Sequence, residues 1–249
     1  MVSHVFAGLS SLFFLTSLVP LQIHNSQKHL YRPTGQEATL TGTITIDGEV
    51  PPQRTIDMTA DRICAQLNPN GKTENVVTTG DKLQNVFVFL ESGASLEQYT
   101  FEQPQTPAVL QHKDCFMRPR VLGIRVNQPL VIENNDPTAH NTHPVPKINV
   151  EWNRSQKEGG EPFTTSFPRA EIFAVKDNHH PWERAWLGVF HHPFFAVSDV
   201  HGQYEIRGIP PGTYKVAMWH ESLGQQLMEI KLAPGEVKSL DVVFARESQ

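Results

Sequence analysis

The chain has 249 residues, enough for two small domains that each bury a core of their own. Nineteen prolines, sixteen glycines and many short Val/Ile/Phe runs favour strands and turns over long helices. The formal net charge of −5 is modest and spread along the chain. Because neither a basic face nor an acidic tail is visible, we expect no nucleic-acid partner.

The N-terminus is a largely apolar run, residues 5–23, followed by a polar segment, residues 24–37. This order is typical of a secretory signal peptide. The start carries no Lys or Arg, no clear cleavage site of small residues follows, and the run is long enough to span a bilayer. Residues 1–26 are therefore expected to be a signal peptide or an N-terminal membrane anchor, and the rest of the chain to be exported, as a periplasmic, secreted or cell-surface protein.

Alternation of apolar and polar side chains predicts strands near both ends of the chain. Residues 39–46 alternate and stop at an Asp-Gly turn, and residues 83–90 are rich in Val and Phe. Downstream, alternation runs through residues 203–216 around the turn sequence Pro-Pro-Gly, which predicts a hairpin. Two last strands are expected at 227–232 and 239–244.

These segments resemble the carboxypeptidase regulatory-like family, a transthyretin-like β-sandwich. Its usual order is a strand with a Gly turn, a V-x-V-x-L strand, then T-D-x-x-G-x-F and P-P-G-x-Y. Here the second and third elements are VFVFL at 86–90 and SDVHGQY at 198–204. The segment between them is roughly a hundred residues, too long for a loop. The resemblance thus implies a discontinuous sandwich, residues 38–104 and 194–246, with an inserted domain, residues 105–193.

Within the insert, four segments predict strands, residues 121–126, 129–133, 164–167 and 172–176. The stretch 134–152 is polar and Pro-rich and is expected to be a loop. The strand sequence LVIENNDPTAHN leads to His140, and the sequence EIFAV leads to the loop VKDNHHPWE.

This pair of segments resembles a cupredoxin, in which a His after N-x-D and a C-x-x-H-P-(aromatic)-M loop bring two imidazoles, a thiolate and a thioether to copper. Position by position, the resemblance implies His140 and His180 as the two imidazole ligands. Asp177 then stands in place of the cysteine and Glu183 in place of the methionine. His143 is a reserve ligand. The expected fold is all-β: a Greek-key cupredoxin-like domain, similar to the cupredoxins of bacterial methylamine-utilisation systems, inserted in the other sandwich.

The two substitutions change the metal chemistry that the site supports. Blue copper depends on a short thiolate bond tuned by a weak axial thioether. Two imidazoles and two carboxylates are a harder set, which holds Cu(II) or Zn(II) but does not favour rapid Cu(I)/Cu(II) cycling. The expected cofactor is therefore copper or zinc. The alternative, a vacant site in which the same residues bind no cofactor, stays open.

The only cysteines are Cys64 and Cys115. An even count in an exported chain favours one structural disulfide, with free or metal-binding thiols as the alternative. The chain contains no G-x-S-x-G, H-E-x-x-H, P-loop or G-x-G-x-x-G motif, so we expect no enzyme.

Three hypotheses for the function follow. The first is an exported, non-catalytic protein that acts in metal binding or assembly. The second is a carbohydrate-binding or structural surface module, whose partner is an unidentified protein or a surface glycan. The third is periplasmic copper electron transfer, which needs a sulfur ligand from elsewhere, and Cys115 is the only candidate if it is not disulfide-bonded.

Overall fold

The structure is a computed structural model that describes residues 1–2 and 28–245, so the prediction of a signal peptide or anchor falls almost entirely outside the described residues. Within these ranges the chain forms twenty-one strands and two short helices, α1 (Arg62–Leu67) and α2 (Ala94–Glu97). The prediction of an all-β fold is thereby confirmed. No helix of the described ranges is long and apolar enough to cross a membrane.

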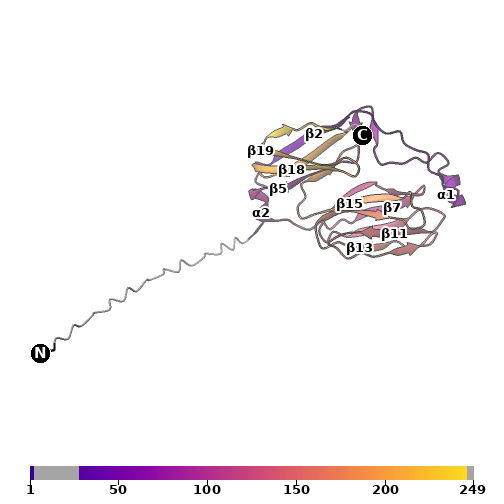
Figure 1. The fold of residues 1–249 in the computed structure, drawn as a ribbon, viewed down its shortest axis with the longest axis horizontal. Coiled ribbons are helices and arrows are strands. Elements are labelled where there is room, and N and C mark those ends of the chain that lie inside the picture. The colour runs from indigo at the N-terminus through magenta and orange to yellow at the C-terminus, as the bar shows by residue number, and fades with distance from the viewer. Residues whose placement is uncertain (3–27, 246–249) are drawn as a thin grey trace.

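The strands from the two ends of the chain form one pair of sheets, called here the terminal sandwich (Figure 1). One sheet has the order β16-β5-β18-β19 and the other the order β17-β2-β4-β3, with β20 and β21 parallel to β2. The bounds are β2 Ala38–Asp47, β3 Thr78–Thr79, β4 Lys82–Leu83, β5 Phe87–Ser92, β16 Phe195–Val197, β17 Gln203–Ile209, β18 Gly212–His220, β19 Gly224–Leu232, β20 Val237–Ser239 and β21 Val242–Ala245. Beside it, β1 (His29–Leu30) pairs in parallel with β6 (Tyr99–Thr100).

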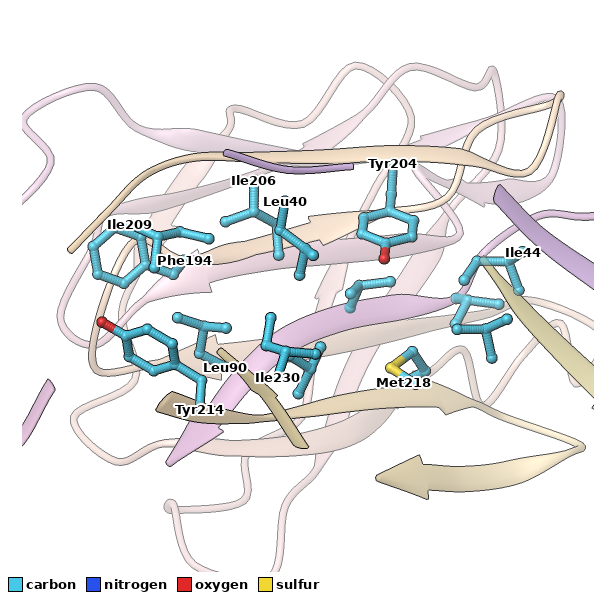
Figure 2. Packing of buried hydrophobic residues seen from close by; sticks show 14 of the residues in the cluster. Leu40, Ile44, Leu90, Phe194, Tyr204, Ile206, Ile209, Tyr214, Met218 and Ile230 are labelled. Carbon is cyan, nitrogen blue, oxygen red and sulfur yellow. The ribbon is translucent and has the colours of Figure 1, made fainter. Parts of the chain in front are cut away.

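Alternating side chains make the core of the terminal sandwich. Every second residue of β2 is buried, including Leu40 and Ile44. In Figure 2 they lie in one cluster with Tyr204 of the same sheet and with Met218 and Ile230 of the opposite sheet. Each fully buried Leu or Ile contributes about 1.5–3 kcal/mol to stability. The inward side chains whose alternation predicted β2 therefore also stabilise it.

The predicted hairpin around the Pro-Pro-Gly turn is wrong. β17 pairs with β2, whereas β18 pairs with β5 and β19 in the other sheet. Because Pro210 and Pro211 have no N–H to donate, they cannot begin a ladder between the two strands. The turn instead carries the chain from one sheet to the other. The strand predicted at 83–90 is also interrupted, at Asn85, whose φ is 64°.

Strands β7 to β15 form a second pair of sheets, the central sandwich. The sheet orders are β13-β10-β7-β8 and β12-β11-β14-β15-β9. The bounds are β7 Ala108–Lys113, β8 Phe116–Arg118, β9 Val121–Arg125, β10 Leu130–Asn134, β11 His140–Val145, β12 Arg154–Gln156, β13 Phe163–Thr165, β14 Glu171–Lys176 and β15 Arg184–Phe190. These strands surround their own core cluster, with Ile124, Ile132 and Leu187 nearly inaccessible. The division into domains at residues 105 and 193 stays a prediction.

The predicted loop 134–152 is wrong in its middle part, because β11 lies there. This strand pairs with β12 at its start and with β14 at its end. Its sequence has low strand propensity and contains Pro144. Pairing on both edges and burial of the first three residues outweigh that propensity.

Aromatic and polar contacts hold the two sandwiches together. The rings of Phe87 in β5 and Phe190 in β15 have centroids 5.7 Å apart. The ring of Trp186 packs on that of Trp219 at 4.9 Å, and its Nε1–H donates to the Glu221 carboxylate at 2.8 Å.

Residues 48–77, which link β2 to β3 and are called here the α1 segment, extend from the terminal sandwich to one end of the central sandwich (Figure 1). A disulfide between Cys64 of α1 and Cys115 fastens the segment there. Cys115 lies in the turn between β7 and β8. Both half-cystines are fully buried. The α1 segment therefore covers the end of the central sandwich where the predicted metal ligands lie.

Candidate metal centre

Two adjacent strands position the four residues that the cupredoxin resemblance implied as ligands. His140 is the first residue of β11, and Asp177, His180 and Glu183 follow β14 in its connection to β15. β11 and β14 are antiparallel neighbours, with His143 opposite Lys176. The start of β11 and the end of β14 therefore lie side by side at the same end of the sheet.

The four side chains converge on one another and are buried. His140 Nδ1 lies 3.1 Å from Asp177 Oδ2 and 2.8 Å from Glu183 Oε1. His180 Nδ1 lies 3.2 Å and 3.7 Å from the same two oxygens. In a tetrahedral site with metal–ligand bonds near 2.0–2.1 Å, neighbouring donor atoms are about 3.3–3.4 Å apart. The four nitrogen–oxygen distances of 2.8–3.7 Å bracket that spacing.

One carboxylate oxygen in this group lacks a well-aligned hydrogen-bond donor. Glu183 Oε1 is buried and accepts no hydrogen bond of normal geometry, although it lies close to His140 Nδ1. The Nδ1 atom of His140 is instead aligned with Asp177 Oδ2. A buried carboxylate oxygen left unpaired is costly, and a shared cation would satisfy it. The donor set therefore fits a divalent metal ion.

Two further residues of the cluster were not predicted from the sequence. His112, in β7, stacks on His140 with ring centroids 4.5 Å apart, and its Nδ1 lies 2.8 Å from Glu183 Oε2. Asp136 Oδ2 lies 3.0 Å from His140 Nε2 and accepts the Cys115 backbone N–H at 2.8 Å. The sequence did carry a signal for each residue. Alternation in β7 places His112 on the same inward face as Leu110, and Asp136 is the acidic residue of the N-x-D sequence.

A third missed residue, Asp61, comes from the α1 segment. Its Oδ1 caps α1 by accepting the backbone N–H groups of Ile63 and Cys64. Its Oδ2 lies 3.1 Å from His180 Nε2 and accepts the Thr138 hydroxyl at 2.9 Å. Burial would raise the pKa of Asp61, but these hydrogen bonds outweigh it and lower the pKa to about 2. The same carboxylate thus fixes the helix and covers His180, which is 3% exposed.

Protons on two imidazoles offset part of the negative charge of the carboxylates in the cluster. Burial disfavours the charged imidazole of His140, yet close contacts with the carboxylates of Asp136, Asp177 and Glu183 outweigh this and raise its pKa to about 11. The pKa of His180 is also raised despite burial, because Asp177 accepts from its ring. Hydrogen bonds from both rings hold the pKa of Asp177 well below its usual range against the effect of burial. A divalent ion that displaced the two imidazole protons would leave the total charge of the cluster unchanged.

The structure does not bring His143, the reserve ligand, into the cluster. Its ring lies toward the surface, with Nδ1 3.1 Å from Asn178 Oδ1 and Nε2 2.7 Å from Glu151 Oε1. The disulfide between Cys64 and Cys115 also means that the alternative of free thiols does not hold in this structure.

Comparison with known proteins gives only a distant likeness. No family model and no curated sequence matches the chain. A Cu-containing nitrite reductase from Thermus scotoductus SA-01 is 15% identical with a TM-score of 0.33, over 41% of this chain and 28% of that one. A purple cupredoxin from Nitrosopumilus maritimus is 19% identical with a TM-score of 0.29, over 33% of this chain and 99% of that one. The reduced Cu(I) form of P52G amicyanin is 17% identical with a TM-score of 0.31, over 41% and 98%.

These solved structures include cupredoxins, and the chain spans less than a third of the nitrite reductase. Likeness of this degree carries no conclusion about ligand or function. The predicted insertion into a transthyretin-like sandwich stays a prediction.

Proposed function

We propose that the protein is an exported, non-catalytic metal-binding protein that holds one divalent copper or zinc ion between His140, Asp177, His180 and Glu183. The observation that carries the proposal is the convergence of two imidazole Nδ1 atoms and two carboxylate oxygens at 2.8–3.7 Å. Glu183 Oε1 has no aligned hydrogen-bond donor in that group.

The donor set favours retention of a metal over electron transfer. Two nitrogen and two oxygen donors suit a divalent ion, and this set contains no thiolate or thioether to stabilise Cu(I). Blue-copper function also depends on a thiolate bond that this set lacks. His180 is buried under the α1 segment and its Nε2 is bound to Asp61, so neither imidazole presents an exposed edge to a redox partner.

The same geometry supports a role without catalysis. Four protein donors complete a tetrahedral coordination, as in structural zinc sites, and leave no position for a substrate. When bound, the ion would supply the positive charge that the two imidazole protons otherwise provide. The role would therefore be metal binding or assembly, for which the partner is unidentified.

Export is part of the proposal. It is supported by the apolar run of residues 5–23 and by the disulfide, a bond that persists mainly in oxidising compartments.

Calorimetric titration with Zn(II), and with Cu(II) followed by electron paramagnetic resonance, tests the proposal. We expect one ion per chain, and loss of binding in the His140→Ala/His180→Ala double variant. His143→Ala is the matched control, because it removes a nearby histidine outside the cluster and should leave the affinity unchanged. Absence of binding by the parent protein, or equal binding by the double variant, would overturn the proposal.

A further inference from the structure

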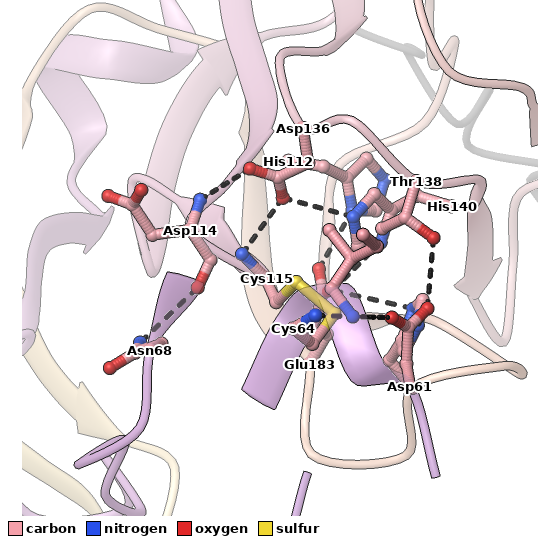
Figure 3. Close-up of a disulfide and its surroundings, with 12 residues drawn as sticks. Asp61, Cys64, Asn68, His112, Asp114, Cys115, Asp136, Thr138, His140 and Glu183 are labelled. Carbon is pink, nitrogen blue, oxygen red and sulfur yellow. Dashed lines mark hydrogen bonds and ion pairs between the residues drawn. A yellow bond between two sulfur atoms is a disulfide. The ribbon is translucent and has the colours of Figure 1, made fainter. Parts of the chain in front are cut away.

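The disulfide packs directly against the imidazole cluster (Figure 3). The Cys64 sulfur and one ring nitrogen each of His140 and His180 all lie within 4.8 Å of one another. The Cys115 sulfur forms a similar group with Asp136 and His140. His140 belongs to both groups, so both sulfur atoms of the disulfide lie near the same imidazole.

Reduction would turn these sulfur atoms into metal ligands. A dithiol reductant transfers two electrons and two protons to the disulfide: the S–S bond breaks, two thiols form, and the reductant leaves as its own disulfide. A thiolate binds metal strongly, whereas a disulfide sulfur does not, and the thiol proton is released when the metal binds.

We propose that the reduced protein has a second metal site, in which the Cys64 thiolate joins His140 and His180, and that this state takes monovalent copper. The inference shares two imidazoles with the proposed function but needs no ion to bind to the oxidised protein. A thiolate with two imidazoles is a softer set than two imidazoles with two carboxylates, and softer donors select Cu(I).

The distances allow this change of ligands. With metal–sulfur bonds near 2.3 Å and metal–nitrogen bonds near 2.0–2.1 Å, sulfur and nitrogen ligands of one ion are about 3.6–3.8 Å apart. The present separations of up to 4.8 Å exceed this by roughly an ångström. Cleavage of the S–S bond frees the Cys64 side chain to rotate, which can supply that movement.

Cys64 is the better placed of the two cysteines. Its group contains two imidazoles, whereas that of Cys115 contains one imidazole and one carboxylate. Cys64 also lies on α1, which after reduction would be held to this end of the central sandwich by noncovalent contacts alone. These include Asp61 with His180, Glu74 with Arg118, and the packing of Met58 near Phe116. Loosening of the α1 segment would give a copper donor access to the buried site.

Two single substitutions isolate the contribution of Cys64. Cys115→Ser leaves the Cys64 thiol free without any reductant, and Cys64→Ser is its matched control, because both variants lose the same disulfide. Cu(I) affinity would be measured anaerobically by competition with a chromophoric Cu(I) chelator. Co(II) titration would report a thiolate ligand by a charge-transfer band in the near ultraviolet.

We expect Cys115→Ser to bind one Cu(I) at least tenfold more tightly than Cys64→Ser, and to give the cobalt–thiolate band, which the control lacks. Addition of His180→Ala to Cys115→Ser should abolish the difference. Equal affinities or no band would overturn the inference. If Cys115→Ser does not fold, wild type reduced with a phosphine answers the same question by X-ray absorption at the copper edge, where a first shell without sulfur contradicts it.

The two proposals can fail separately. Zn(II) binding by the disulfide-bonded protein tests the proposed function alone, and Cu(I) binding by Cys115→Ser tests the thiolate site alone.

Discussion

Replacing Glu183 by Gln should remove most of the stabilisation that zinc gives. The side chain is fully buried and Gln has the same size, so the change removes a charge without leaving a cavity. In the metal-free protein it breaks buried pairs with His112 and His140, both at 2.8 Å. Breaking a buried pair costs about 3–5 kcal/mol, so this variant should be less stable even without metal.

The response to zinc separates a ligand from a merely structural carboxylate. At free zinc of 100 times Kd, binding adds about 2.7 kcal/mol to the stability of the native state. For a protein of this size that corresponds to a rise in Tm of roughly 5–10 °C. We expect this rise in wild type and its near-complete loss in Glu183→Gln, measured by scanning calorimetry after chelator treatment.

Glu221→Gln is the matched control. Glu221 is also a buried carboxylate with a cationic partner, Arg120, and it accepts from Trp186, but it lies between the sandwiches and away from the cluster. It should lower Tm yet keep the full zinc-induced rise. The reasoning is refuted if zinc raises Tm equally in both variants, or if it raises Tm in neither of them nor in wild type.

Further predictions concern the disulfide, the cap of α1 and a buried histidine. Cys64 and Cys115 are 51 residues apart, so replacing both by Ser should cost about 4 kcal/mol of unfolding free energy in guanidinium titrations; a loss near zero would show that the α1 segment is held without the bond. Asp61→Ala removes the α1 cap and should accelerate amide exchange at residues 62–67 but not in β14 or β15, since caps contribute about 0.5–2 kcal/mol; equal acceleration in those strands would contradict a local role. His220, 1% exposed, has its pKa lowered to about 4 by burial and by Arg120, so between pH 6.5 and 4 the unfolded state binds a proton that the folded state does not. His220 should therefore contribute a loss of about 1.4 kcal/mol per pH unit on acidification of the metal-free protein across that window, beside the similar contribution of His192, whose pKa is also lowered to about 4. His220→Gln should lose less; an unchanged slope in the variant would rule out His220 as a cause.

Sequence patterns predicted strands best where burial alone decides the structure. The alternation at residues 39–46 corresponds to β2, because every second residue of that strand faces the core. β11 was missed because it is held by its two neighbouring strands rather than by its own propensity, which Pro144 lowers. The supposed hairpin failed for a related reason: alternation tells which side chains face a core, but not which strand is the hydrogen-bonding neighbour.

The cluster was predictable only where its residues belong to one local spacing pattern. Asp177, His180 and Glu183 lie in a single connection, and the resemblance of that connection to a cupredoxin loop implied that they group with His140. His112 and Asp61 come from β7 and the α1 segment, which reach the site only through tertiary packing and the disulfide. Neither residue belongs to a sequence motif that includes the loop with His180, so spacing could not predict its place in the cluster.

The most direct test of the central claim is a crystal structure of the zinc-loaded protein with anomalous diffraction recorded on both sides of the zinc absorption edge. The account predicts one anomalous peak about 2.0–2.2 Å from His140 Nδ1, His180 Nδ1 and one oxygen each of Asp177 and Glu183. Zinc elsewhere, for example at His143 on the surface, together with an unoccupied cluster, would contradict it and leave these residues as a buried network of charges.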